Sequence, residues 1–261
     1  MNVTRADTWP DLDEQLHAGA WDESLKRFRL RAAFRGAGRV GEGLRTSLSR
    51  LGGDYAAKER HIIRNFRKYA RRSLEGEDSV WNWLALAKHH GLPTRMLDWS
   101  FSPYVALHFA TQATSDFDQD GEIWVVGFPA VNRFLPRPLA ALLEEEGSDV
   151  FSTEMLGAVA ASLRRFDALA DEPFMLFLEP PSLDERIVNQ AALFSIISSA
   201  TQETEAWLER HADACRRIVI PASLKWEIRD RLDQLNITER VLFPGLDGLS
   251  AWLKRYYLER T

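Results

Sequence analysis

Short apolar segments typical of strands recur along this chain, but a helix does not separate every consecutive pair of them. The strand-like segments cover residues 30–36, 121–128, 174–178, 193–198 and 216–220. Helices are predicted over residues 12–28, 55–74, 80–89, 102–113, 139–146, 153–169, 203–211, 223–235 and 249–257. A doubly wound parallel sheet would need strict alternation of strands and helices. The pattern therefore favours an α+β fold with a mixed or antiparallel sheet and surrounding helices.

The chain is long enough to bury a sizeable core, and its single cysteine limits the chemistry it can carry. We expect one domain over residues 1–261, with its motifs between about 28 and 250 and one helix added at each end. Cys215 alone can form neither an internal disulfide nor a thiolate metal cage, which fits a reducing compartment. The N-terminus lacks the apolar core of a signal peptide, and no apolar stretch reaches about 18 residues. We therefore expect a cytoplasmic protein that crosses no membrane.

A basic, amphipathic helix is predicted over residues 55–74. Ile62, Phe66 and Tyr69 share one face, whereas Lys and Arg side chains populate the rest of the helix between residues 58 and 72. Such a stretch is either a solvated helix face or a contact for nucleic acid or another anionic partner. The net charge of -5 argues against a broad basic surface, so an anionic partner would have to bind locally.

Residues 89–100 combine a rigid turn with polar groups. A glycine and a proline end the preceding helix, and Thr94, Arg95 and Asp98 then follow between apolar residues. The short separation of Arg95 and Asp98 predicts an ion pair between them. From the residues alone, the segment is either a well-packed structural loop or the polar wall of a site.

The most specific strings of the sequence occur at three places in a fixed order. The first is Phe34-Arg35-Gly36, and the second is HHGLPTRMLDWSFSPYVALHFA, which starts at His89. The third is LFPGLDG, which starts at Leu242. Together they resemble the signature of FRG-domain proteins, so the chain is identified as a member of that family, with a single FRG domain.

The order of these motifs is also similar to that of ADP-ribosyltransferases. In those enzymes an arginine ends the first strand, a serine-containing strand opens a helix, and a late strand carries a catalytic glutamate. The resemblance places Arg35 at the first position, Ser100 or Ser102 at the second, and Glu239 at the third as the catalytic residue. It implies an ADP-ribosyltransferase-like fold that uses NAD as its substrate and no metal. The implied reaction is transfer of ADP-ribose to a macromolecular acceptor, or hydrolysis of NAD.

The residue types at these positions fit that chemistry. Cleavage of the nicotinamide–ribose bond develops positive charge on the sugar, which a carboxylate such as that of Glu239 would stabilise. A guanidinium from Arg35 or Arg95 would hold the phosphates as a bidentate fork. The other residues expected to bind the cofactor are Gly36, His90, Thr94, Asp98, Ser100 and Ser102.

A second alignment with the transferases leaves the late strand without a carboxylate. It places Asn189-Gln190 there, so that Gln190 would stand where the catalytic glutamate is expected. The chain would then be a non-catalytic nucleotide- or nucleic-acid-binding module. A metal site built from the histidines and the aspartate within residues 89–108 is a further alternative, but their spacing matches no ligand motif.

Overall fold

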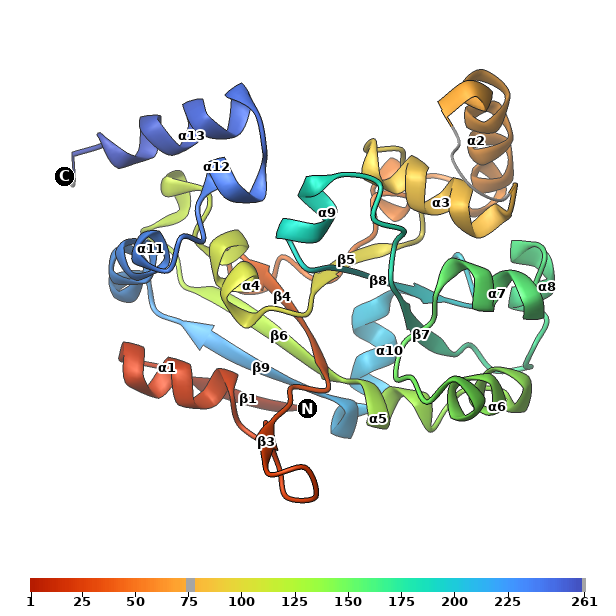
Figure 1. Cartoon of the computed structure of the whole chain (residues 1–261), viewed down its shortest axis with the longest axis horizontal. Helices are drawn as coiled ribbons and strands as arrows, with labels where there is room; N and C mark the ends of the chain where they lie inside the picture. The colour runs from red at the N-terminus through yellow and green to blue at the C-terminus, as the bar shows by residue number, and fades with distance from the viewer. Residues whose placement is uncertain (74–77, 260–261) are drawn as a thin grey trace.

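A seven-stranded sheet forms the centre of the computed structural model, which describes residues 1–73 and 78–259 (Figure 1). Its strands are β1 (Asn2–Arg5), β4 (Ala32–Ala37), β5 (Leu97–Ser100), β6 (Gly121–Gly127), β7 (Met175–Leu178), β8 (Ala192–Ile197) and β9 (Cys215–Ile220). They lie side by side in the order β1-β9-β6-β4-β5-β8-β7. β1 pairs with β9 in parallel, and the other neighbours are antiparallel. The predicted α+β fold with a mixed sheet is therefore confirmed.

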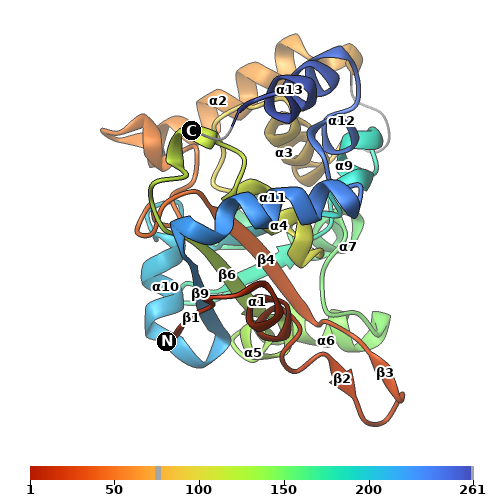
Figure 2. The same cartoon turned by 90° about the vertical axis from the view of Figure 1, so that its left-hand side faces the viewer.

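Helices cover both faces of this sheet (Figures 1 and 2). They are α1 (Trp9–Leu16), α2 (Tyr55–Tyr69), α3 (Val80–His89), α4 (Pro103–Ala110), α5 (Phe128–Asn132), α6 (Arg137–Glu146), α7 (Thr153–Val159), α8 (Leu163–Asp167), α9 (Glu185–Asn189), α10 (Thr204–Arg210), α11 (Lys225–Gln234), α12 (Glu239–Leu242) and α13 (Leu246–Tyr256). On one face, α1, α4 and α11 enclose a core with Phe34 and Ile123. On the opposite face, α5 and α10 enclose a core with Trp124 and Trp207. A further core joins α2, α3, α6, α7 and α8 to β7 and β8.

Local sequence signals account for most of these elements. Helix α3 has the predicted bounds, and Gly91 follows it with a φ of 78°, a backbone conformation that glycine adopts at little cost. Ser102 caps α4 and Pro103 is its first residue, as expected, but the helix already ends at Ala110. Helix α2 starts at the predicted Tyr55, whereas residue 74 of the predicted range lies outside the described residues. Within the described residues, no helix has both the length and the apolar character to cross a membrane.

Two predicted helices are wrong in part, and local hydrogen bonds give the reason. The first helix covers only Trp9–Leu16, and a hairpin of β2 (Trp21–Asp22) and β3 (Arg27–Phe28) follows it. The Asp22 carboxylate accepts hydrogen bonds from the backbone N–H groups of the two residues at the start of the turn, which favours a turn over a helix. The helix predicted over 153–169 is two short helices, because Ala160 is extended and its carbonyl oxygen accepts the indole N–H of Trp81.

The serine-containing strand that the resemblance implied is β5, which ends at Ser100 and leads into α4. The residues alone predicted a loop here, since this strand is short and carries two polar side chains. It is nevertheless a full member of the sheet, hydrogen-bonded to β4 on one side and to β8 on the other. The motif therefore contributes one strand of the sheet and one helix that covers it.

Gly36 explains why two of the sequence motifs meet in space. Helix α4 lies directly on β4 at this residue, with the small side chains of Ala106 and Ala110 turned toward the strand core. A Cβ atom at position 36 would lie 2.7 Å from the backbone nitrogen of Ala110, and closer still to the carbonyl oxygen of Ala106. A side chain therefore does not fit between the strand and the helix.

Candidate functional site

A cleft of about 740 Å³ opens where β4 and β5 meet the C-terminal end of α3 and helix α9. It brings together the start of the glycine-rich loop after β4 and residues from α3, β5, α4, α9 and β8. Its polar lining consists of Arg35, Glu42, Lys88, His89, His90, Asp98, Ser100, Arg186 and Gln190. Six of the residues that the sequence predicted for the site line this cleft. They are Arg35, Gly36, His90, Asp98, Ser100 and Gln190, the last of which was the alternative at the position of the catalytic glutamate.

Arg35 supplies a positive charge with no carboxylate partner of its own. The side chain is half-buried, and its Nη1 donates a hydrogen bond to the backbone carbonyl oxygen of Asp98 at 2.6 Å. No ion pair to a carboxylate is formed within the described part of the chain. Burial lowers the pKa of the Arg35 guanidinium from its ordinary value, which expresses the cost of holding this charge away from water. An anion in the cleft would offset that cost.

Asp98 places a carboxylate in the same cleft. The side chain of Asp98 is 58% exposed, and its Oδ2 lies 2.6 Å from Nζ of Lys88 at the end of α3. The predicted ion pair between Arg95 and Asp98 is therefore wrong. Lys88 fixes the direction of the Asp98 side chain from the facing helix, so the carboxylate stands at a defined place on the cleft wall.

A histidine–aspartate contact joins two elements of the cleft wall. Nε2 of His89 lies 2.7 Å from Oδ2 of Asp184, whose other oxygen accepts the backbone N–H of Ile187 and so caps α9. The ring of His90 packs against that of His89 with centroids 5.2 Å apart. Helices α3 and α9 are thereby connected across the cleft. Within the described residues, no group of three or more His, Cys, Asp or Glu side chains could hold a metal ion.

Ser100 and Gln190 hold the floor of the cleft together. The Ser100 hydroxyl donates to the carbonyl oxygen of Gln190 at 2.7 Å and accepts the backbone N–H of Ser102 at 3.0 Å. The side-chain amide of Gln190 donates in turn to the carbonyl oxygen of Leu242. Both side chains therefore connect β5 and α9 to the segment that leads into the C-terminal helices.

The wall of the cleft formed by α9 and α4 contains a cation and aromatic rings that no sequence motif had indicated. Arg186 of α9 lies over the ring of Phe243 at 5.2 Å, and Phe109 of α4 meets the same ring edge-on. Arg186 is exposed and forms no ion pair within the described ranges. It belongs to no recognisable motif, and only the fold brings it opposite Arg35, so the sequence carried no signal for it.

Three residues predicted to bind the cofactor lie outside the cleft and have other partners. Arg95 is buried and forms ion pairs with Glu59 of α2 and with Asp167 of α8, so it has no fork to offer to a phosphate. Thr94 is buried, and its backbone N–H donates to the Ser47 hydroxyl. Ser102 accepts the backbone N–H of the third residue of α4 as its cap. All three therefore hold the fold around the cleft instead of lining it.

Glu239 is not on a strand, because it is the first residue of α12. It is nearly buried, and its carboxylate accepts hydrogen bonds from Arg229 at 2.9 Å and from Arg255 at 2.6 Å and 2.9 Å. Burial alone would raise the pKa of Glu239, but the hydrogen bonds from Arg255 and the charge of Arg229 bring it down to about 2. It does not line the cleft. Its contacts are those of a residue that stabilises the C-terminal helices.

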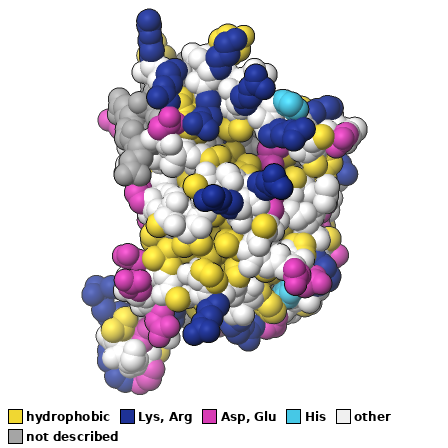
Figure 3. Space-filling view, turned by 90° about the vertical axis from the view of Figure 1, so that its right-hand side faces the viewer, with side chains coloured by type: hydrophobic (Ala, Val, Ile, Leu, Met, Phe, Trp, Pro, Cys, Tyr) yellow, Lys and Arg dark blue, Asp and Glu magenta, His cyan; other side chains and the backbone are white. Residues whose placement is uncertain are grey.

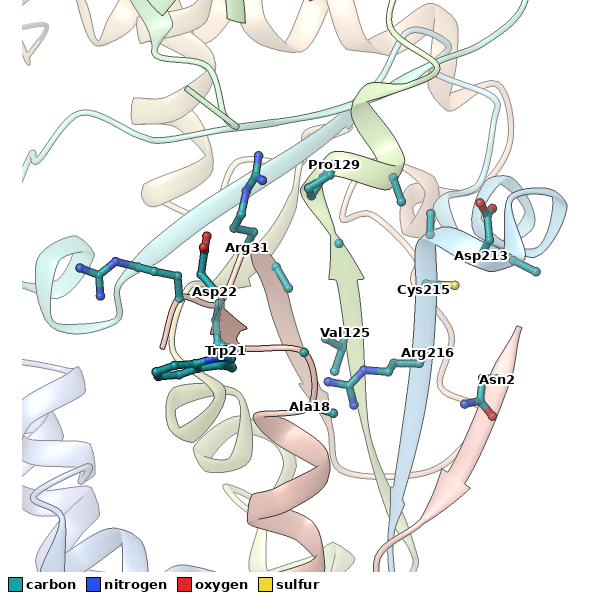
Figure 4. Close-up of a pocket in the computed structure, with 18 of the residues that line it drawn as sticks. Asn2, Ala18, Trp21, Asp22, Arg31, Val125, Pro129, Asp213, Cys215 and Arg216 are labelled. Atoms are coloured by element: carbon teal, nitrogen blue, oxygen red, sulfur yellow. The ribbon is translucent and has the colours of Figure 1, made fainter. Parts of the chain in front are cut away.

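A second cleft, of about 660 Å³, lies between the β2–β3 hairpin and the ends of β6 and β9 (Figure 4). Arg216 reaches from β9 across Val125 toward Ala18, and its guanidinium donates to the carbonyl oxygen of Gln15 at the end of α1. Cys215 lies beside it, and burial raises the pKa of its thiol to about 11, so it remains a protonated side chain. None of the residues predicted for function lines this second cleft.

The comparisons with known proteins point to the segment that holds the first two sequence motifs, whereas the third, which starts at Leu242, lies outside the matched residues. The family model of the FRG domain matches residues 30–119, which run from just before β4 to just before β6. Curated proteins and solved structures give no match. The matched residues include Arg35, Gly36, the end of α3 and strand β5, which form one side of the first cleft. The chain is therefore an FRG domain-containing protein.

Proposed function

We propose that the first cleft binds NAD, with the dinucleotide phosphates on the guanidinium of Arg35. The observation that supports this most is the half-buried positive charge of Arg35, which has a backbone carbonyl as its partner and no carboxylate within the described residues. A guanidinium of this kind retains N–H donors that match the geometry of a phosphate.

The other features of the cleft fit a ligand of nucleotide size and charge. Its volume of about 740 Å³ lies within the range of ligand sites in proteins, roughly 300–1,000 Å³. Arg186 offers a second cation from the facing wall, so two linked phosphates could be held between β4 and α9. Phe109 is half-buried at the margin of the cleft and offers a ring face or edge to a base or a nicotinamide ring.

If the bound NAD is turned over, the cleft geometry favours Asp98 over Glu239 as the carboxylate. Cleavage of the nicotinamide–ribose bond develops positive charge on the sugar, and a carboxylate beside it stabilises that charge. Asp98 lines the cleft and is exposed to it, whereas Glu239 is buried with two arginines elsewhere. The ADP-ribose unit would then pass to a macromolecular acceptor or to water, with nicotinamide as the leaving group.

A non-catalytic nucleotide-binding module is the second candidate. It is favoured by the ion pair between Lys88 and Asp98, which offsets the negative charge of the only aspartate among the lining residues. On the wall formed by α9 and the residue that follows it, the cleft is lined by Arg186, Ile187 and Gln190, and none of these side chains is a carboxylate.

The two candidates are separated by incubating the protein with NAD and measuring both free nicotinamide and the melting temperature. We expect NAD to raise the melting temperature of the wild type, and Arg35→Ala to abolish that shift because the phosphate partner is lost. Arg137→Ala, which removes an exposed arginine of α6, is the matched control and should keep the shift.

The catalytic part is tested by Asp98→Asn, which keeps the shape of the side chain and removes its charge. If NAD is turned over, this variant should release nicotinamide at least about tenfold more slowly while it still binds NAD. A shift in melting temperature without nicotinamide release from the wild type would support the binding module. The absence of both would contradict the proposal as a whole.

A further inference from the structure

The outward face of helix α2 is a surface of unpaired positive charge on a chain whose net charge is -5. Its inward face carries Glu59, Ile63 and Phe66, which contact the core. The exposed cationic side chains on the remainder are Lys58, Arg60, Arg64 and Lys68, and the exposed Arg72 follows in the turn after the helix. None of them forms an ion pair with a carboxylate of the described residues, since Asp78 is occupied by the neighbouring Arg67 and Arg71.

A buried ion cluster fixes this face in place. Glu59 is the one acidic residue of α2, and it is turned inward to pair with Arg95. Arg95 also pairs with Asp167, the last residue of α8, at 2.6 Å. Arg95 therefore links the two helices, and the exposed Arg164 and Arg165 of α8 lie within one turn of the linked Asp167. Figure 3 shows Lys and Arg side chains gathered over the upper part of this side of the molecule.

An aromatic ring lies at the same surface. Tyr69 was predicted to share the apolar face of the helix, but its side chain is 79% exposed, and Nζ of Lys68 lies 5.1 Å from the centre of its ring. An exposed ring beside a row of cations is the combination with which proteins hold unpaired bases while they neutralise the phosphates. From Arg60 to Lys68 the row extends about 12 Å along the helix, which is long enough to contact more than one phosphate of a strand.

We propose that the surface formed by α2 and the cations of α8 binds single-stranded nucleic acid through its phosphate backbone, with Tyr69 as a stacking platform. Arginine supplies most of the cations, and its planar fork fits phosphate oxygens. An anionic membrane is the poorer partner because, among the described residues of α2, Tyr69 is the only exposed large apolar side chain that could enter the lipid. The proposal does not depend on the reaction in the cleft.

The test is the fluorescence anisotropy of a labelled oligothymidine strand titrated with the full chain. We expect wild-type binding to weaken steeply between about 50 and 200 mM salt, as phosphate contacts require. The triple variant Arg60→Glu, Arg64→Glu, Lys68→Glu should bind at least about tenfold more weakly. Its salt slope should fall by about 2, since each phosphate contact to a single strand contributes about 0.7 to the slope.

The matched control is the triple variant Arg27→Glu, Arg137→Glu, Lys254→Glu. It changes the net charge by the same amount, but these exposed residues lie on β3, α6 and α13. It should keep wild-type affinity within about twofold if binding is local. Tyr69→Ala should lose affinity about fivefold or more with an unchanged salt slope, because stacking is not ionic.

Some outcomes would overturn the proposal. One is that the wild type shows no salt-sensitive binding of the oligothymidine. The other is that the two triple variants lose affinity equally although circular dichroism shows both to be folded. Co-sedimentation with phosphatidylserine vesicles that depends on Arg60, Arg64 and Lys68, without oligonucleotide binding, would assign the surface to a membrane instead.

Discussion

The carboxylate of Glu239 balances two guanidiniums, and the side chain of Arg229 has no exposure to solvent. Removing one partner from such a group leaves a buried charge without compensation, which costs about 3–5 kcal/mol. We therefore expect Glu239→Gln to lower the free energy of unfolding by about that amount, measured by urea denaturation. Any NAD turnover per folded molecule should persist, because Glu239 does not line the cleft.

Glu227 provides the control for this prediction. It pairs with Arg231 one turn along the exposed side of α11, with both side chains nearly half exposed. Glu227→Gln should change the free energy of unfolding by less than about 1 kcal/mol, as is usual for surface ion pairs. Equal effects of the two substitutions, or loss of turnover in a fully folded Glu239→Gln protein, would contradict the structural role of Glu239.

At the scale of elements, the contact between β4 and α4 depends on the absence of a side chain at Gly36. Gly36→Ala would force the helix away from the strand, since the clash is with backbone atoms that cannot rotate aside. We expect a loss of at least about 1–3 kcal/mol in the free energy of unfolding, and a displaced Arg35 in whatever folds. Chemical denaturation and NAD binding measure the two effects.

Gly127 is the matched control for Gly36. It ends β6, the strand next to β4, and a methyl group there would meet no atom closer than 4.0 Å. Gly127→Ala should therefore leave the free energy of unfolding within about 1 kcal/mol of the wild type. If both glycines tolerate alanine equally, the tight packing at Gly36 is not what holds α4 in place.

The sequence predicts an element well where the signal is local, and poorly where the structure depends on a strand or side chain that is distant in the sequence. The cap formed by Ser102 and the glycine after α3 are local, and both are found where they were expected. β5 was predicted as a loop from its residues, because its strand character comes from β4 and β8 on either side. The partner of Arg95 is likewise set by packing, since Glu59 is distant in sequence and Asp98 is close.

The same distinction holds for the cleft. Arg35, Asp98 and Ser100 stand in recognisable strings and were selected, whereas Arg186 stands in none and was missed. Glu239 was selected because its position suited a late strand, but the chain forms a helix at that point. The sequence shows the order of the motifs along the chain, but the topology of the fold determines which of their side chains line the same cleft.

At the scale of the whole molecule, a buried charged cluster ties the C-terminal segment to the rest. Nδ1 of His108 in α4 is 2.9 Å from Arg229 in α11, which pairs with Glu239 in α12, which pairs with Arg255 in α13. Burial, and then the charge of Arg229, lower the pKa of His108 from its ordinary value of 6.5 to about 3. The folded protein therefore requires a neutral imidazole at this point.

This cluster predicts how stability depends on pH. The unfolded chain takes up a proton on His108 below about pH 6.5, and the folded chain does so only near pH 3, so stability falls as the pH is lowered through that interval. Glu239 acts in the same direction between 4.5 and about 2. Each group contributes a slope of up to about 1.4 kcal/mol per pH unit. Urea denaturation at several pH values measures the slope.

A substitution separates the contribution of His108 from that of the other groups. His108→Gln removes the titrating group, so the slope of unfolding free energy between pH 6.5 and 4.5 should be smaller than in the wild type. Identical slopes in the two proteins would show that His108 is not held neutral by the fold.

The cleft is lined by residues from within the matched segment, which ends at residue 119, and by residues later in the chain. The matched segment supplies β4, α3 and β5, but Arg186 comes from α9 and Gln190 is the residue that follows it, and β6 lies between β4 and β9 in the sheet. The matched segment therefore forms only part of the cleft, and the remainder of the cleft comes from residues later in the chain. A protein that received residues 30–119 alone would contain the motif and Arg35, but it would lack the cleft wall that carries Arg186 and Gln190.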